Sequence, residues 1–294
     1  MSHRGENMTN KANNLYRLII SMCIFGTIGI LRKFMPLSST LIALCRAAIG
    51  SVFLIFVVLL RREKLVWCEI KKNLLWLSLS GAAIGFNWIF LFEAYNYTTV
   101  TTATLCYYMA PTIAVVASHF LFKEYLTVKK GICVLVAFLG MVLVSGAAGG
   151  EVPTASELRG VLFGLAAAVL YGAVILLNKK ITVGSPYVKT LFQLAVAGLV
   201  LLPYTALTEN LSSVTFSPSV VLLLAVAGIV HTGFAYALYF GSIKELKTQT
   251  VALLSYIDPI LAIVLSALIL HEPMGVKEII GSVLILGAAY ISEK

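Results

Sequence analysis

Residues 110–124 read APTIAVVASHFLFKE, and residues 258–272 read DPILAIVLSALILHE. The two stretches align without a gap at a shift of 148 residues, and the same register extends toward the N-terminus. The matched pairs are Gly85 and Gly233, Phe86 and Phe234, Phe92 and Phe240, Tyr108 and Tyr256, Pro111 and Pro259, Ser118 and Ser266, and Glu124 and Glu272. Apolar residues match easily by chance, but proline, glycine and glutamate in one register do not. The sequence therefore predicts two related halves.

The composition indicates that lipid surrounds most of the molecule. Of the 294 residues, 60% are hydrophobic and 12% are charged, and the mean hydropathy is +0.95. Soluble domains have about 25% charged residues, so these charges are too few to cover an aqueous surface. The net charge of +9 comes from Lys and Arg in short gaps between apolar runs, where we expect contacts with anionic lipid. No basic groove for nucleic acid can be identified.

Long apolar runs dominate the chain, and a run of about 20 residues is enough for one membrane-spanning α-helix. The predicted spans are 15–35, 38–60, 73–94, 98–121, 127–147, 158–178, 187–207, 218–241, 248–270 and 275–292. Strands of a membrane β-barrel would have about 10 residues with strict alternation, whereas these runs are continuous. We therefore predict an all-α integral membrane protein with ten transmembrane helices.

Positive charges are distributed unequally between the two ends of these spans. Of the 22 Lys and Arg residues, 17 lie on the side of the chain termini, four lie on the opposite side, and Arg46 lies inside a span. Lys and Arg mark the cytoplasmic side, so we predict a multi-pass protein of the inner (plasma) membrane with both termini cytoplasmic. Residues 1–14 are expected to be a disordered cytoplasmic leader without a cleavable signal.

Each half contains five predicted spans, and an odd number places the second half upside down relative to the first. The prediction is two inverted-topology five-helix repeats, residues 15–147 and 158–294, joined by a linker at residues 148–157. Inverted repeats are common in secondary transporters, which bind substrate near the middle of the membrane between the two halves.

The repeated segment resembles the EamA domain of the drug/metabolite transporter superfamily. In that family a helix with a central proline ends at an acidic residue in a short loop, and a glycine-rich helix follows. Gly140 and Gly281 fall where such glycines are expected, although the first half has Cys133 at the position where the second half has Gly281. The resemblance covers essentially the whole chain, as two EamA copies. It implies transport, with substrates that range from amino acids and sugars to nucleotide derivatives and drugs.

Pro111 and Pro259 lie near the middle of their predicted spans at matched positions. A proline inside a helix removes one hydrogen bond and clashes with the preceding turn. We predict that both act as hinges that free backbone carbonyls toward a central cavity, although a static packing kink would give the same pattern. Glu124 and Glu272, in short loops, are expected to share a structural task such as bracing a helix terminus.

Polar and ionisable side chains within the apolar runs are candidates for substrate contact, because such groups are costly in lipid and usually face a cavity. Arg46 could bind a carboxylate or phosphate, and Asp258 could bind an amine. Each could instead serve the structure, as an interhelical hydrogen-bond hub or as a helix cap. Stripes of polar and aromatic residues complete the prediction. The predicted substrate-binding residues are Arg46, Asn87, Trp88, Tyr108, Tyr171, Asn178, Tyr236 and Asp258.

Three residues are candidates for proton coupling. Asp258 lies at mid-span, and His231 lies near the centre of its span, where a histidine could exchange protons near neutral pH. A hydrogen-bonded core histidine fits position 231 equally well. Glu93 lies near the outer end of its span and could instead reach the membrane interface.

We expect a secondary active or facilitative carrier of small organic metabolites that works by alternating access, with amino acids or related zwitterions favoured and export as its direction. A lipophilic-cation or drug exporter is the alternative, and an intramembrane enzyme is less favoured because no paired catalytic motif is present. No cofactor is expected, since the chain lacks a nucleotide-binding loop and a Cys/His metal spacing. The Gly81/Gly85 and Gly160/Gly164 pairs fit close packing within a monomer or a weak homodimer.

Overall fold

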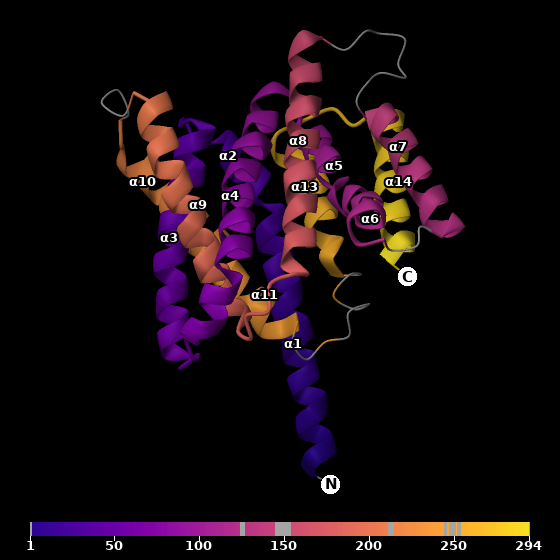
Figure 1. The fold of residues 1–294 in the computed structure, drawn as a ribbon. Coiled ribbons are helices and arrows are strands. Elements are labelled where there is room, and N and C mark those ends of the chain that lie inside the picture. Colours follow the sequence, from indigo (N-terminus) through magenta and orange to yellow (C-terminus); the bar gives the residue numbers. More distant parts are fainter. Residues whose placement is uncertain are drawn as a thin grey trace.

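The computed structural model describes residues 2–123, 127–144, 154–210, 215–243 and 254–293, together with residues 246 and 251, and every regular element in these ranges is a helix (Figure 1). In the first half the helices are α1 (Ser2–Gly26), α2 (Ile28–Lys33), α3 (Ser39–Leu60), α4 (Trp67–Tyr97), α5 (Val100–Tyr107), α6 (Ala110–Phe122) and α7 (Val128–Val144). In the second half they are α8 (Ala155–Asn178), α9 (Pro186–Thr208), α10 (Pro218–Ala225), the π-helix η2 (Val226–Phe234), α11 (Ala235–Ile243), α13 (Ile257–Ile269) and α14 (Val276–Glu293).

Seven segments in the described part of the chain are long and apolar enough to cross a membrane. They coincide with seven of the predicted spans. The other three predicted spans coincide with α7 and α13, which have 17 and 13 residues, and with α14. The described connections between these helices are short, and the fold is that of an all-α membrane protein.

Helix α1 begins at Ser2, which differs from the disordered leader expected for residues 1–14. No proline precedes Pro36, so the hydrogen bonding of the apolar segment can continue toward the N-terminus. At the other predicted boundary, α8 begins at Ala155, three residues earlier than expected. Thr154 and Glu157 form a capping box there, which satisfies the first backbone N–H groups of the helix.

Three long helices are interrupted near the centre of the molecule. Thr27 separates α1 from α2, and Tyr108 and Met109 separate α5 from α6. Pro111 then lies in the first turn of α6, where its missing N–H costs little. The third interruption is η2, a π-helical stretch of nine residues between α10 and α11. Short helical irregularities of this kind are frequent at functional sites.

The two halves are interlocked rather than placed side by side. Helix α3 packs against α9, α4 against α8 and α9, and α1 against α11 and α13. Helices α7 and α14 pack against each other at one edge of the bundle (Figure 1). They cross where a Cβ atom on Gly140 would lie 2.8 Å from the Gly281 carbonyl oxygen, so both residues permit the close approach.

Candidate substrate cavity

A cavity of about 530 Å³ lies between the two halves, and residues of α1, α2, α3, α4, α5, α6, α8, α9, α11 and α13 line it. All eight residues predicted to bind substrate are in its wall: Arg46, Asn87, Trp88, Tyr108, Tyr171, Asn178, Tyr236 and Asp258. Residues far apart in the chain are thus brought to one place.

Arg46 is a buried cation held by neutral groups. Its Nε donates a hydrogen bond of 3.1 Å to Thr232 Oγ1, and its guanidinium lies over the rings of Trp88 and Phe92 at 4.2 and 5.3 Å. Among the described residues, no carboxylate lies within ion-pair distance of Arg46. A guanidinium stacked on aromatic faces keeps its planar edge available for a carboxylate or phosphate.

The π-helix explains how Arg46 is positioned. The hydroxyl of Thr232 accepts from Arg46 and donates to the Ala227 carbonyl oxygen at 3.0 Å, five residues earlier. In an α-helix this carbonyl would be engaged by the residue four positions later, so the wider π-helical turn changes which groups can meet. This segment also packs tightly on α3, since a Cβ atom on Gly228 would lie 2.4 Å from the Cβ atom of Ile49.

Asp258 lies in the first turn of α13, where a carboxylate is favoured by the helix dipole. The hydroxyl of Tyr108 faces this carboxylate from the break between α5 and α6. Helix α1 ends against the same point, because a Cβ atom on Gly26 would lie only 2.7 Å from the Asp258 carbonyl oxygen. Helix capping and substrate binding are thus both compatible with the position of Asp258.

Aromatic rings form much of the remaining wall. Tyr107 and Tyr171 are stacked with centroids 5.3 Å apart, and Phe25 and Tyr236 are 5.4 Å apart. Tyr107 was not among the predicted residues, because it falls outside the spacing of the polar stripe that contains Tyr108. The break after Tyr107 changes the local direction of the chain, and both tyrosines reach the cavity as a result.

The two predicted amides are already engaged between helices. Asn87 Nδ2 donates to the Ala167 carbonyl oxygen at 2.6 Å. Gln193 Nε2 donates two hydrogen bonds, one to Asn178 Oδ1 at 2.9 Å and one to Ser80 Oγ at 2.8 Å. Gln193 was not predicted as a site residue, although it lines the cavity.

His231 and Glu93, predicted as proton-coupling candidates, do not line the cavity. His231 is 5% exposed, and its ring nitrogens lie 2.8 Å from Thr27 Oγ1 and 3.2 Å from the Val226 carbonyl oxygen. It therefore joins η2 to the break between α1 and α2. Glu93 accepts a bond of 3.3 Å from Asn96 Nδ2, near the end of α4. His231 is thus a hydrogen-bonded core residue, and proton coupling by either residue remains a prediction.

The two predicted hinge prolines are placed differently. Pro111 lines the cavity, whereas Pro259 is buried in the first turn of α13 outside the cavity wall. Each lies near the start of a helix that follows a turn, at Tyr108 and Tyr256 respectively. The turns provide bending points, and the hinge role remains a prediction.

Hydrogen bonds close the upper end of the bundle in Figure 1. The Glu272 carboxylate accepts from the Val100 N–H at 2.8 and 3.0 Å, accepts from the Ser266 hydroxyl, and lies 3.9 Å from Lys33 Nζ. Thr101 Oγ1 donates to Ser266 Oγ at 3.3 Å. Glu272 therefore braces the N-terminus of α5, the kind of task that the sequence predicts for it. The matching Glu124 lies outside the described residues.

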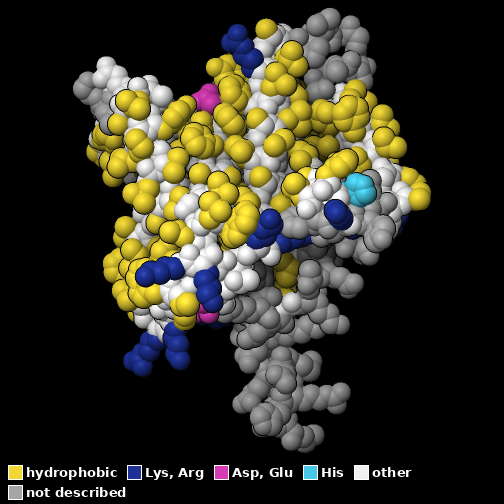
Figure 2. All heavy atoms as spheres, in the orientation of Figure 1, with side chains coloured by type: hydrophobic (Ala, Val, Ile, Leu, Met, Phe, Trp, Pro, Cys, Tyr) yellow, Lys and Arg dark blue, Asp and Glu magenta, His cyan; other side chains and the backbone are white. Residues whose placement is uncertain are grey.

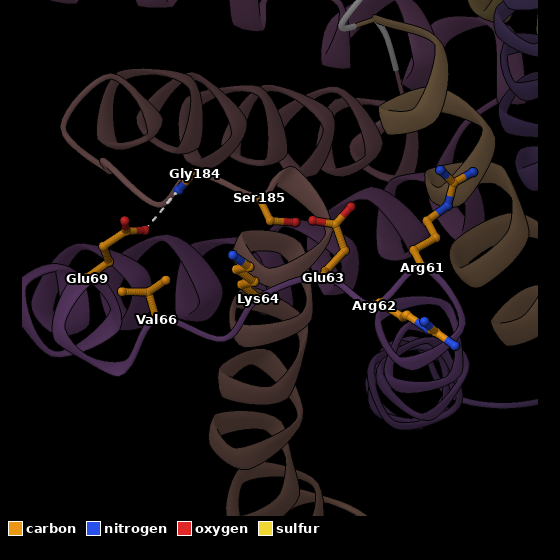
Figure 3. A pocket seen from close by; sticks show the side chains of 8 residues that line it. All are labelled: Arg61, Arg62, Glu63, Lys64, Val66, Glu69, Gly184 and Ser185. Carbon is orange, nitrogen blue, oxygen red and sulfur yellow. Dashed lines mark hydrogen bonds between the residues drawn. The ribbon is translucent and has the colours of Figure 1, made fainter.

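A second, more open pocket of about 370 Å³ lies at the lower end, between the α3–α4 turn and the α8–α9 turn (Figure 3). Arg61, Arg62, Lys64 and Glu63 line it, and Glu69 accepts a bond of 3.1 Å from the Gly184 N–H. None of the predicted site residues is in this pocket. The bond ties the two halves together at this end of the molecule.

Comparison with known proteins agrees with this architecture. The model of the EamA-like transporter family matches residues 15–146 and 158–293. The uncharacterized transporter YxxF of Bacillus subtilis (strain 168) is 30% identical, over 87% of this chain and 81% of its own length. Protein RarD of Salmonella typhimurium is 26% identical, over 76% of each chain. A crystal structure with a TM-score of 0.64 and 22% identity covers 95% of this chain and 96% of its own, and shows the same fold. The chain belongs to the EamA-like transporter family of the drug/metabolite transporter superfamily.

Proposed function

We propose that this protein is a ten-span carrier that exports small organic metabolites, with amino acids or related zwitterions favoured, by alternating access between two inverted repeats. The observation that carries the proposal is the cavity between the halves, which has a cation at Arg46, a carboxylate at Asp258 and aromatic walls. An α-amino acid offers both opposite charges, and the aromatic rings can pack against its side chain.

The helix contacts support the inverted repeats. In the proposed correspondence α4 matches η2 and α11, α8 matches α1, and α3 matches α9. The contact of α4 with α8 then becomes the contact of α11 with α1, and both contacts are present. The pairs α7 with α14 and α3 with α9 map onto themselves. Exchange of the conformations of two such halves would convert an inward-open carrier into an outward-open one.

The distribution of charge supports the proposed orientation. Most Lys and Arg side chains on the visible face lie in its lower part, below a largely hydrophobic region (Figure 2). Positive residues favour the cytoplasmic side, so the lower end would be cytoplasmic. The cavity wall includes Lys189 in the second turn of α9 and Asn178 at the end of α8, both toward this end. With the Glu272 contacts intact at the other end, this arrangement fits an inward-facing state ready to load substrate for export.

The direct test is a thermal-stability screen of the purified full-length protein against amino acids, amines and sugars, because a ligand that binds only the folded state raises the melting temperature. Hits are then measured as substrates in proteoliposomes. We expect amino acids to stabilise the protein and to be transported. Stabilisation by lipophilic cations alone would instead favour the drug-export alternative, which the carboxylate of Asp258 among aromatic rings also fits.

Two variants separate these alternatives. Arg46→Ala should abolish binding of amino acids but leave binding of a lipophilic cation intact, because the cation has no acidic group for Arg46. Asp258→Asn should weaken both. Unchanged amino-acid transport in both variants would contradict the proposed site.

A further inference from the structure

The cavity wall contains more positively charged side chains than negatively charged ones. Among the described residues that line it, the charged side chains are Arg46, Lys189 and Asp258, which gives two cations and one carboxylate. The sequence interpretation counted Lys189 among the charges that mark the cytoplasmic side, since it lies close to the start of a predicted span. The structure places it in the wall of the cavity, on the same helix as Gln193.

No carboxylate among the described residues forms an ion pair with either cation. Arg46 is held by a hydroxyl and two aromatic rings, and Lys189 has no ion pair among the described residues. Arg46 is buried and Lys189 is partly buried, and an anionic partner stabilises a cation in such surroundings because the effective dielectric constant is lower than in water. The N-terminal end of α9 adds partial positive charge near Lys189.

An unsatisfied hydroxyl lies beside Lys189. Thr190 is 4% exposed, it lines the cavity, and its Oγ1 is one of three buried side-chain polar atoms in the described residues without a hydrogen-bond partner. Buried polar atoms nearly always have a hydrogen-bond partner. An unpaired hydroxyl in a cavity wall therefore indicates that a ligand or a water molecule supplies its partner. The Thr190 hydroxyl is therefore available to donate to a ligand in this cavity.

We infer that the cavity selects an amphoteric solute with one amino group and two acidic groups, the amine facing Asp258 and the acids divided between Arg46 and Lys189. This inference rests on the proposed function and narrows its substrate class from zwitterions to molecules with net negative charge. A zwitterion would leave one cation of the cavity wall without an acidic partner. A second carboxylate or a phosphate on the side chain would pair it.

The test compares probes that differ in one acidic group: L-glutamate with L-glutamine, and O-phospho-L-serine with L-serine. Melting temperature and binding affinity are measured on the purified full-length protein. The acidic member of each pair should bind at least about tenfold more tightly, since one charge pair at the effective dielectric of a protein contributes more than 1.4 kcal/mol.

Three variants locate the effect. Lys189→Met should reduce the affinity for L-glutamate to that for L-glutamine and leave L-glutamine unchanged, whereas Lys189→Arg should keep the preference. Lys180→Met is the control, since Lys180 is exposed, lies over the Trp76 ring at 4.4 Å and does not line the cavity. Size-exclusion profiles and melting temperatures without ligand show whether each variant is folded.

The outcomes separate the inference from the proposed function. Equal affinity within each pair, or tighter binding of the neutral members, would overturn the inference while amino-acid transport stood. The same would follow from a preference that survives in a folded Lys189→Met variant. Absence of binding by all four probes would overturn both the inference and the amino-acid assignment.

Discussion

At the scale of single residues, Arg46 is the group that we propose recognises an acid in the cavity. Its guanidinium is fixed by Thr232 and Trp88 rather than by a carboxylate. We expect Arg46→Lys to weaken binding of L-glutamate by at least about tenfold, because an ammonium cannot reproduce both the stacking and a two-pronged contact with an acid. Isothermal titration on the purified variant measures this loss. Arg17→Lys, outside the cavity wall, is the matched control, and equal losses in the two variants would contradict the role of Arg46.

Gly26 also matters at this scale, because its lack of a side chain lets two helices pack closely. A Cβ atom there would lie 2.7 Å from the Asp258 carbonyl oxygen, which is backbone and cannot rotate away. Gly26→Ala should therefore lower the free energy of unfolding by about 1–3 kcal/mol and shift the melting temperature down by several degrees. Gly287→Ala is the control, because no atom lies within 4 Å of the added methyl group, and it should be neutral or stabilising. Similar melting temperatures for the two variants would show that α1 and α13 can separate at no cost.

At the scale of elements, the contacts of Glu272 join the second half to the N-terminus of α5. Glu272→Gln removes the charge and one acceptor, so the contacts at this end, which is the outer end in the proposed orientation, should weaken by about 1 kcal/mol or more. In a background without native cysteines, Thr101→Cys should then react faster with a membrane-impermeant maleimide added from outside. Glu278→Gln, in the adjacent first turn of α14, should leave the labelling rate unchanged. Equal labelling rates in the two variants would mean that Glu272 does not hold the outer end closed.

The interruptions of the long helices were also the feature that was hardest to predict from the sequence. Hydropathy is local, so each predicted span coincides with helix in the described residues. Pro111 signalled a kink in its span, but nothing in the sequence signalled the break at Thr27 or the π-helix, which depend on contacts with other helices. The cavity residues could be predicted because polar groups in apolar runs are rare. Lys189 was missed because a lysine near a helix end fits membrane topology equally well.

At the scale of the whole molecule, the interlocking of the halves predicts that neither half is a stable unit alone. The main packing partners of α3 and α4 include α8 and α9, so a first half without the second would expose faces that are buried in the intact chain, including Arg46. We expect residues 1–150 or 151–294, expressed separately, to be degraded, and the two pieces expressed together to assemble. The measurement is co-purification through a tag on one piece, followed by L-glutamate binding. The cut between residues 150 and 151 interrupts no described helix. If the two pieces fail to assemble, the loss of a helix is therefore not the reason. A first half that is stable and monodisperse alone would contradict this view, because its α3 and α4 faces would then need no partner from the second half.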